Sequence, residues 1–172
     1  MTPHPVTLLV LALAAASRLF ELWLSARNQR EIERRGGHRV RPDGTLGLVI
    51  VHSAWFAGMV LEESLAGRAG LPSSVLWTAA GLAVASEALR IACIRNLGVR
   101  WNVGVVILPG AAPITTGLHG WMRHPNYTAV VLQLVTVPLA LDLPWTAAGI
   151  LLPKLLVLRH RIALEDAALG RR

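Results

Sequence analysis

The sequence predicts an all-α integral membrane protein with about five transmembrane helices, and three observations support this prediction. Hydrophobic residues make up 53% of the 172 residues and charged residues only 16%, against about 25% in soluble domains. The charges occur in short blocks, and the apolar stretches between them approach the roughly 20 residues that a helix needs to cross a bilayer. The arginines gather at the ends of these stretches, as the positive-inside rule requires.

Five apolar segments are expected to span the membrane, and a long connector separates the third from the fourth. The expected spans cover about residues 5–24, 45–61, 74–97, 127–141 and 145–158. Only three residues separate the last two spans, so these should form a tight helical hairpin. We expect one membrane domain, in which residues 1–97 form a three-span region and residues 98–172 hold the cofactor-binding connector, the hairpin and a catalytic tail.

The charges of the loops predict the orientation. The first loop, residues 27–43, carries six arginines against three acidic residues, whereas the second holds Glu62, Glu63 and only Arg68. The connector and the tail are basic again, so the first loop, the connector and the C-terminus should be cytoplasmic and the N-terminus outside. The expected location is the inner (plasma) membrane. These loops explain the net charge of +7, and no nucleic-acid partner is expected.

Polar groups inside the spans are costly and mark either the bundle interior or a functional cavity. Arg18, Glu21, Ser25 and Asn28 are three, four and three residues apart, so they share one helical face. They could lock the bundle, or they could meet a ligand, because Arg18 and Glu21 approach the cytoplasmic end of the first span.

The other spans carry polar groups as well. Glu87 and Arg90 in the third span are three residues apart, so we expect them to pair and lock the bundle. His52, with Trp55 one turn on, is expected to be an interior histidine. The candidates for contact with the substrate or for the bundle interior are Arg18, Glu21, Asn28, His52, Trp55 and Arg90. Cys93, the only cysteine, is expected to be a buried thiol, and one cysteine cannot build a zinc site; no metal is expected.

The connector and the hairpin contain the segments that point to chemistry. Residues 117–127 read G-L-H-G-W-M-R-H-P-N-Y and lead into the fourth span, and residues 159–166 read R-H-R-I-A-L-E-D after the fifth. The hairpin should bring the two segments together at one membrane face, where Arg161 and Glu165 share a helical side. A basic interfacial belt with an aromatic side chain is the alternative on spacing alone. The connector, with an extended run over 102–108, is long enough to favour a functional role.

The motif R-H-P-x-Y before a short helical hairpin, followed by R-x-x-x-E-[ED], resembles the isoprenylcysteine carboxyl methyltransferase family. The wider relatives of that family include bacterial phospholipid methyltransferases. Residues 18–28, His52 and residues 97–110 resemble a bacterial branch linked to type III polyketide synthases, whose members O-methylate alkylpyrones or alkylresorcinols. The resemblance thus covers most of the chain.

This resemblance implies a membrane enzyme that uses S-adenosylmethionine and has no Rossmann domain. The sequence agrees, since it has neither a G-x-G-x-x-G motif nor an alternating β/α pattern. The matching positions imply cofactor contacts for Leu118, His119, His124, Pro125, Tyr127 and Glu165. They imply catalytic roles for Arg161 and Glu165. The chain departs from the family in having His119 in place of an expected tyrosine, Asp166 in place of a second glutamate, and a short tail after Leu169.

The expected reaction is transfer of a methyl group to an acidic oxygen of a lipophilic acceptor. Such an oxygen is already ionised near neutral pH, so Arg161 could hold it without help from a strong base. The acceptor would enter from the bilayer among membrane lipids. An alkylpyrone or alkylresorcinol is favoured, and a prenylcysteine carboxylate is possible. The alternatives are a phospholipid N-methyltransferase and a non-enzymatic scaffold or small transporter, although no repeat supports a transporter.

Overall fold

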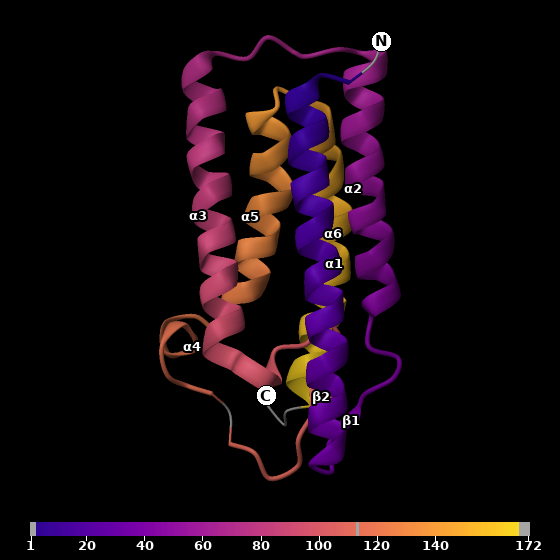
Figure 1. Ribbon diagram of the computed structural model, residues 1–172, viewed down its shortest axis with the longest axis vertical. Coiled ribbons are helices and arrows are strands. Elements are labelled where there is room, and N and C mark those ends of the chain that lie inside the picture. The colour runs from indigo at the N-terminus through magenta and orange to yellow at the C-terminus, as the bar shows by residue number, and fades with distance from the viewer. Residues whose placement is uncertain (1–2, 113, 169–172) are drawn as a thin grey trace.

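The computed structural model describes residues 3–112 and 114–168, and long helices dominate this part of the chain (Figure 1). The long helices run side by side: α1 (Pro5–Arg34), α2 (Thr45–Leu65), α3 (Ser73–Leu97), α5 (Pro125–Ala140) and α6 (Pro144–Ala168). The connector holds a short helix, η1 (Gly98–Arg100), strand β2 (Val106–Ile107) and helix α4 (Leu118–Trp121). Strand β1 (His38–Arg39) lies in the first loop. The all-α prediction is confirmed.

The ends of the helices differ from the expected spans mainly where polar segments stay helical. Helix α1 continues ten residues past the expected end because its last turns carry pairs one turn apart. Gln29 donates to Glu33 at 2.8 Å, and Glu31 forms ion pairs with Arg34 at 2.9 Å and Arg35 at 2.8 Å. Such pairs stabilise an exposed helix. Helix α6 likewise runs on from the expected end at residue 158 to Ala168, so the predicted catalytic tail is helical over its described part.

The loops divide between the two ends of the bundle. The α1–α2 loop and the connector lie at one end, together with the end of α6, whereas the α2–α3 loop and the hairpin turn lie at the other (Figure 1). At the connector end β1 and β2 pair antiparallel, with His38 opposite Ile107 and Arg39 opposite Val106. This grouping agrees with the expected alternation of basic and acidic loops. The side of the membrane stays a prediction.

Acidic residues of the opposite end join the helices there. Asp142, in the hairpin turn, accepts hydrogen bonds from the backbone N–H groups of Gly70 at 2.8 Å and Leu71 at 2.9 Å. Glu62 of α2 accepts from the N–H groups of Trp145 at 2.9 Å and Thr146 at 2.6 Å. These N–H groups belong to the first turn of α6 and have no partner within their own helix. The carboxylate of Glu62 therefore caps α6 and fixes α2 against the hairpin.

The outer surface of the bundle is apolar, as a lipid-facing surface must be. In the described residues α1, α2 and α3 are long and apolar enough to cross a membrane. Large apolar side chains point outward on several helices, among them Leu19 (66% exposed), Trp77 (78%) and Leu152 (65%). Helix α5 has 16 residues, about 24 Å of helix. The expected spans formed by α5 and α6 stay predictions.

We predict that reporter domains inserted after Arg35 and fused to the C-terminus report the same compartment, and that one inserted after Ala66 reports the other. Arg35 follows α1 at the connector end, where the described part of α6 also ends, and Ala66 follows α2 at the opposite end. Paired alkaline phosphatase and green fluorescent protein fusions in a bacterial host would measure this. The arginine excess predicts that Arg35 is cytoplasmic. The same signal at Arg35 and Ala66 would contradict the arrangement.

Candidate active site

A cavity of about 550 Å³ opens at the connector end and extends into the bundle. Its walls come from α1, α2, α3, α5, α6 and the connector. This volume lies within the range typical of small-molecule sites. Ten of the residues that the sequence singled out line it: Arg18, Glu21, His52, Arg90, His119, His124, Pro125, Tyr127, Arg161 and Glu165.

The hairpin brings the two sequence motifs into direct contact beside this cavity. The Tyr127 hydroxyl, on α5, donates to Oε2 of Glu165, on α6, at 2.5 Å. The same hydroxyl accepts a hydrogen bond from Nε of Arg161 at 3.0 Å. The His124 ring stacks on the Tyr127 ring, with 5.4 Å between centroids. The predicted proximity of the motifs is therefore confirmed, and an arginine, a tyrosine and a glutamate form a continuous chain of hydrogen bonds.

Arg161 also joins two segments that are distant in sequence. Its side chain is almost fully buried, at 3% exposure. Nη1 donates to the backbone carbonyl of Asp43 at 3.0 Å, and Nη2 donates to that of Val103. One guanidinium thus links the first loop, the connector and α5, and its planar set of five donors suits this geometry. Three of these donors are occupied by protein acceptors.

The first loop is held in place by an ion pair next to Arg161. Asp43 is buried, and its Oδ2 accepts from Nε of Arg39 at 2.7 Å while its Oδ1 accepts from the Thr45 backbone N–H at 3.1 Å. Burial works against ionisation of this carboxyl, but the hydrogen bonds from Arg39 and Thr45 outweigh it and lower its pKa from 3.8 to about 2. Asp43 is therefore ionised at physiological pH, and its backbone carbonyl stays aimed at Arg161.

Several buried polar atoms at the connector end of the cavity lack a partner within the described residues. They are Nε1 of Trp101, Oδ1 of Asn102 and Oδ1 of Asn126, and these three residues line the cavity. Nε2 of His124, which also lines the cavity, makes no hydrogen bond in the described residues but lies 3.8 Å from Oδ1 of Asp166. An unsatisfied buried polar group costs about 1–3 kcal/mol. A set of donors and acceptors gathered on one wall is what a polar ligand would satisfy. His119 lies at the same end, where Nδ1 is 2.8 Å from Nδ2 of Asn96.

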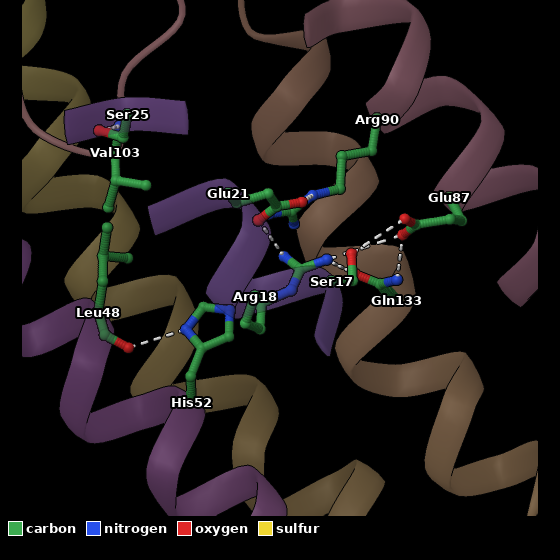
Figure 2. A network of polar contacts seen from close by, with 10 residues as sticks. All are labelled: Ser17, Arg18, Glu21, Ser25, Leu48, His52, Glu87, Arg90, Val103 and Gln133. Atoms are coloured by element: carbon green, nitrogen blue, oxygen red, sulfur yellow. Dashed lines mark hydrogen bonds and ion pairs between the residues drawn. The ribbon is translucent and has the colours of Figure 1, made fainter. Parts of the chain in front are cut away.

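A network of charged residues joins three helices (Figure 2), and three of its members, Arg18, Glu21 and Arg90, line the cavity. Both carboxylate oxygens of Glu21 accept from Arg90, and Nη1 of Arg18 lies 3.1 Å from Oε2 of Glu21. Arg18 also reaches Oε2 of Glu87 at 3.7 Å, and Gln133 of α5 donates to that oxygen at 2.6 Å. The network connects α1, α3 and α5.

The expected pairing of Glu87 with Arg90 is therefore wrong. The two residues are one turn apart on α3, but Arg90 is buried while the Glu87 side chain is 34% exposed. Arg90 turns inward to Glu21 of α1, which offers it both carboxylate oxygens, a geometry that suits a guanidinium. Glu87 turns to Arg18 and Gln133 instead. The shared helical face of Arg18, Glu21, Ser25 and Asn28 is confirmed, since Ser25 and Asn28 contact the connector.

The other predicted residues, apart from His52, lie outside the cavity wall. His52 lines the cavity, and its Nδ1 lies 2.8 Å from the carbonyl oxygen of Leu48. Trp55 is buried and donates to the Leu134 carbonyl at 2.9 Å, and Asn28 donates to the Trp101 carbonyl at 2.7 Å. Trp55 therefore belongs to the bundle interior, and Asn28 fixes the connector against α1. Leu118 is not part of the cavity wall. Cys93 is buried, as expected.

Three residues that line the cavity were not predicted as site residues from the sequence: Asn102, Asn126 and Lys154. Asn126 occupies the variable position of R-H-P-x-Y, and Asn102 begins the extended run of the connector. Lys154 is the only lysine of the chain and lies within an expected span. Its position alone marked it as a functional candidate, because an ionisable group inside an apolar span is rare and costly.

Comparison with known proteins identifies the family of the chain. Residues 79–171 match the isoprenylcysteine carboxyl methyltransferase (ICMT) family, and the chain belongs to this family. It is also similar to the uncharacterized protein YpbQ of Bacillus subtilis strain 168, with 25% identity over 94% of this chain and 95% of that protein. An uncharacterized protein of Haemophilus influenzae is 25% identical over 90% of each chain. No solved structure matches the chain significantly.

Family and fold together define a multi-pass integral-membrane methyltransferase. The matched region contains α5, α6 and the connector, and so it includes both motifs and the Arg161–Tyr127–Glu165 contacts. It begins within α3, so α1 and α2 lie outside it. The two relatives nevertheless align over nearly the whole chain.

We predict that Glu21→Gln destabilises the protein strongly, because it leaves the buried guanidinium of Arg90 without its ionic partner. Breaking a buried ion pair costs about 3–5 kcal/mol, and the Tm should fall by about 6 °C or more. Thermal unfolding of the purified protein in detergent measures this. Glu31→Gln, which removes exposed ion pairs of the same helix, is the matched control and should leave the Tm nearly unchanged. Equal Tm values for the two variants would contradict the assigned role of Glu21.

Proposed function

We propose that this chain is an S-adenosylmethionine-dependent O-methyltransferase that methylates an acidic oxygen of a lipophilic acceptor in the inner membrane. The observation that carries the proposal is the cavity itself. Its walls combine polar residues, which include the family's motifs, with charged and apolar side chains of the bundle. A polar methyl donor from the cytoplasm and a lipid-like acceptor from the bilayer could meet in such a space.

The polar end fits the donor in the chemistry of its residues. Asn102 and Asn126 offer buried polar atoms that have no hydrogen-bond partner among the described residues, and the His124 ring lies beside them with only a 3.8 Å contact to Asp166. They would hold the charged and polar groups of S-adenosylmethionine, and the rings of His119 and Tyr127 would pack against its adenine. When bound, the cofactor supplies an electrophilic methyl group on a sulfonium. Pro125 begins α5 directly after His124, so a rigid helix start keeps these side chains in place.

The chain of hydrogen bonds from Arg161 through Tyr127 to Glu165 orders the reaction region. Tyr127 is held from both sides, since it accepts from Arg161 and donates to Glu165. Arg161 retains two N–H donors beyond its three occupied ones, and these can face an anionic oxygen next to the cavity. An ionised enol or carboxylate needs no general base. The task of the protein is therefore to hold oxygen, methyl and sulfur in line, about 3–3.5 Å apart for the reacting atoms.

The acceptor is expected to be long-chained and to enter laterally. Phe56 and Val130 line the inner part of the cavity. Leu22 of α1 and Val49 of α2 also line it, and each is 49% exposed. Their exposure would suit a cavity that opens toward lipid beside these two helices. An alkylpyrone or alkylresorcinol is favoured over a prenylcysteine carboxylate, because the N-terminal half resembles the polyketide-linked branch of the family.

We predict that His124→Ala and Tyr127→Ala weaken binding of S-adenosylmethionine while the protein still inserts and folds. Each variant removes one ring of the stacked pair, and Tyr127→Ala also removes the link between Arg161 and Glu165. Loss of such contacts should weaken the affinity by about tenfold or more. Isothermal titration calorimetry on detergent-purified protein measures it.

Trp121→Ala is the matched control for these variants. Trp121 lies in α4, near the same motif, but it is 93% exposed and does not line the cavity, so its removal should leave the affinity unchanged. An unchanged affinity in both His124→Ala and Tyr127→Ala would argue against this cofactor site. Wild-type protein that binds no S-adenosylmethionine would favour a scaffold or transporter instead.

We predict that purified protein with S-adenosylmethionine methylates long-chain alkylpyrones faster than short-chain ones. Each methylene that enters the apolar part of the cavity should add up to about 0.8 kcal/mol of binding free energy. Mass spectrometry of the products, with an alkylpyrone series of increasing chain length, measures kcat/KM. Methylation of phosphatidylethanolamine or of a prenylcysteine analogue, with none of the alkylpyrones, would reassign the acceptor and leave the methyltransferase in place.

A further inference from the structure

Lys154 is a buried cation for which the protein supplies no partner among the described residues. It lies near the middle of α6, its side chain is 2% exposed, and it lines the inner part of the cavity. The described residues offer it no hydrogen bond and no carboxylate within 4.0 Å. Arg18, Arg90 and Arg161 line the same cavity, and all three carry charge of the same sign as Lys154. Lys154 therefore adds a further positive charge to the cavity wall and neutralises none.

The acidic groups near the cavity are already engaged elsewhere. Glu21 accepts from Arg90 and pairs with Arg18, and Glu87 pairs with Arg18 and accepts from Gln133. Glu165 accepts from Tyr127. Arg161, the other cation of α6 on the cavity wall, is satisfied by one hydroxyl and two backbone carbonyls. The wall lined by Lys154 is thus the place where positive charge is left without compensation.

A buried charge without a partner is strongly unfavourable, and replacing it by an apolar side chain usually stabilises a protein. Lysine is especially expensive within an apolar bundle, where such groups mark ligand pathways. The cavity provides the space for a compensating anion. Phe56 and Val130 also line the cavity, so a ligand that fits it would carry both a negative charge and apolar surface.

We propose that Lys154 binds the anionic group of the acceptor and thereby selects ionised amphiphiles over neutral ones. This inference rests on the proposed function and deepens it, because it names the charge of the acceptor and the residue that recognises it. Lys154 and Arg161 are seven residues apart, two turns of α6, so they lie on the same side of the helix. Lys154 draws the ionised head group into the cavity, and Arg161, about 10 Å further along the helix, then holds its oxygen next to the cofactor-binding residues for the reaction.

The test compares two amphiphiles that share a chain length and differ in charge. Palmitate and cetyl alcohol are titrated into the purified full-length protein in a neutral detergent, and the two affinities are measured by calorimetry. Wild-type protein should prefer palmitate. Lys154→Met, which keeps the length of the side chain and removes its charge, should weaken palmitate binding by more than about tenfold and leave cetyl alcohol unchanged. Lys154→Arg, which retains the charge, should keep the preference.

Arg159→Met is the matched control, since Arg159 lies on the same helix but is exposed and outside the cavity wall. It should leave both affinities unchanged. The Tm of Lys154→Met should rise, because an uncompensated charge is removed from the interior. A palmitate preference that is the same in wild type and Lys154→Met would overturn the proposal. So would a lower Tm together with equal losses for both amphiphiles, which would indicate a structural role.

The same preparations separate this inference from the proposed function. If the wild type binds S-adenosylmethionine but its palmitate preference does not depend on Lys154, the methyltransferase stands and the anion site fails. If the wild type binds no S-adenosylmethionine while Lys154→Met still loses the palmitate preference, the anion site stands and the proposed function fails.

Discussion

The structure depends on one constraint: a charge inside an apolar bundle must find an opposite charge or a hydrogen-bond partner. Glu21 meets this constraint for two arginines, Arg90 of α3 and Arg18 of its own helix. Large apolar side chains of α1, such as Leu19 and Phe20, point outward, where lipid would solvate them and where they add nothing to packing. Polar contacts of its inner face therefore hold α1 against the bundle (Figure 2), and three residues of these contacts, Arg18, Glu21 and Arg90, also line the cavity.

The same rule builds the polar end of the site. Arg161 is buried, and backbone carbonyls of two loops satisfy it together with the hydroxyl of Tyr127. Because these acceptors belong to the first loop, the connector and α5, one side chain determines how three separate segments surround the cavity. Fold and site thus share residues in this protein, so a substitution at Arg161 would disturb both. Lys154 is the exception, since no partner is found for it among the described residues, and for that reason it points to a ligand.

Much of the fold followed from local patterns. Apolar runs bounded by arginines predicted where the long helices lie, and α3, with its apolar composition, begins within one residue of its expected start. The short turn around Asp142 and Leu143 made the hairpin unavoidable, and a hairpin forces the residue before α5 and the end of α6 to the same end of the bundle. The contact between Tyr127 and Glu165 could therefore be anticipated. The ends of α1 and α6 could not, because polar helices outside the apolar runs leave no hydropathy signal.

The sequence by itself determined which residues share a helical face, since that depends only on the 3.6-residue period of a helix. Only the tertiary structure decided which face meets which. Arg90 could have paired with Glu87 one turn away, but the packing of α1 against α3 presents both oxygens of Glu21, and a guanidinium prefers that geometry. Nor could the sequence show that Asn102, Asn126 and Lys154 line a common cavity. The first lies in the connector and the others on α5 and α6. Whether a buried group has a partner depends on all the residues that surround it in space, and the spacing of residues along the chain does not encode that.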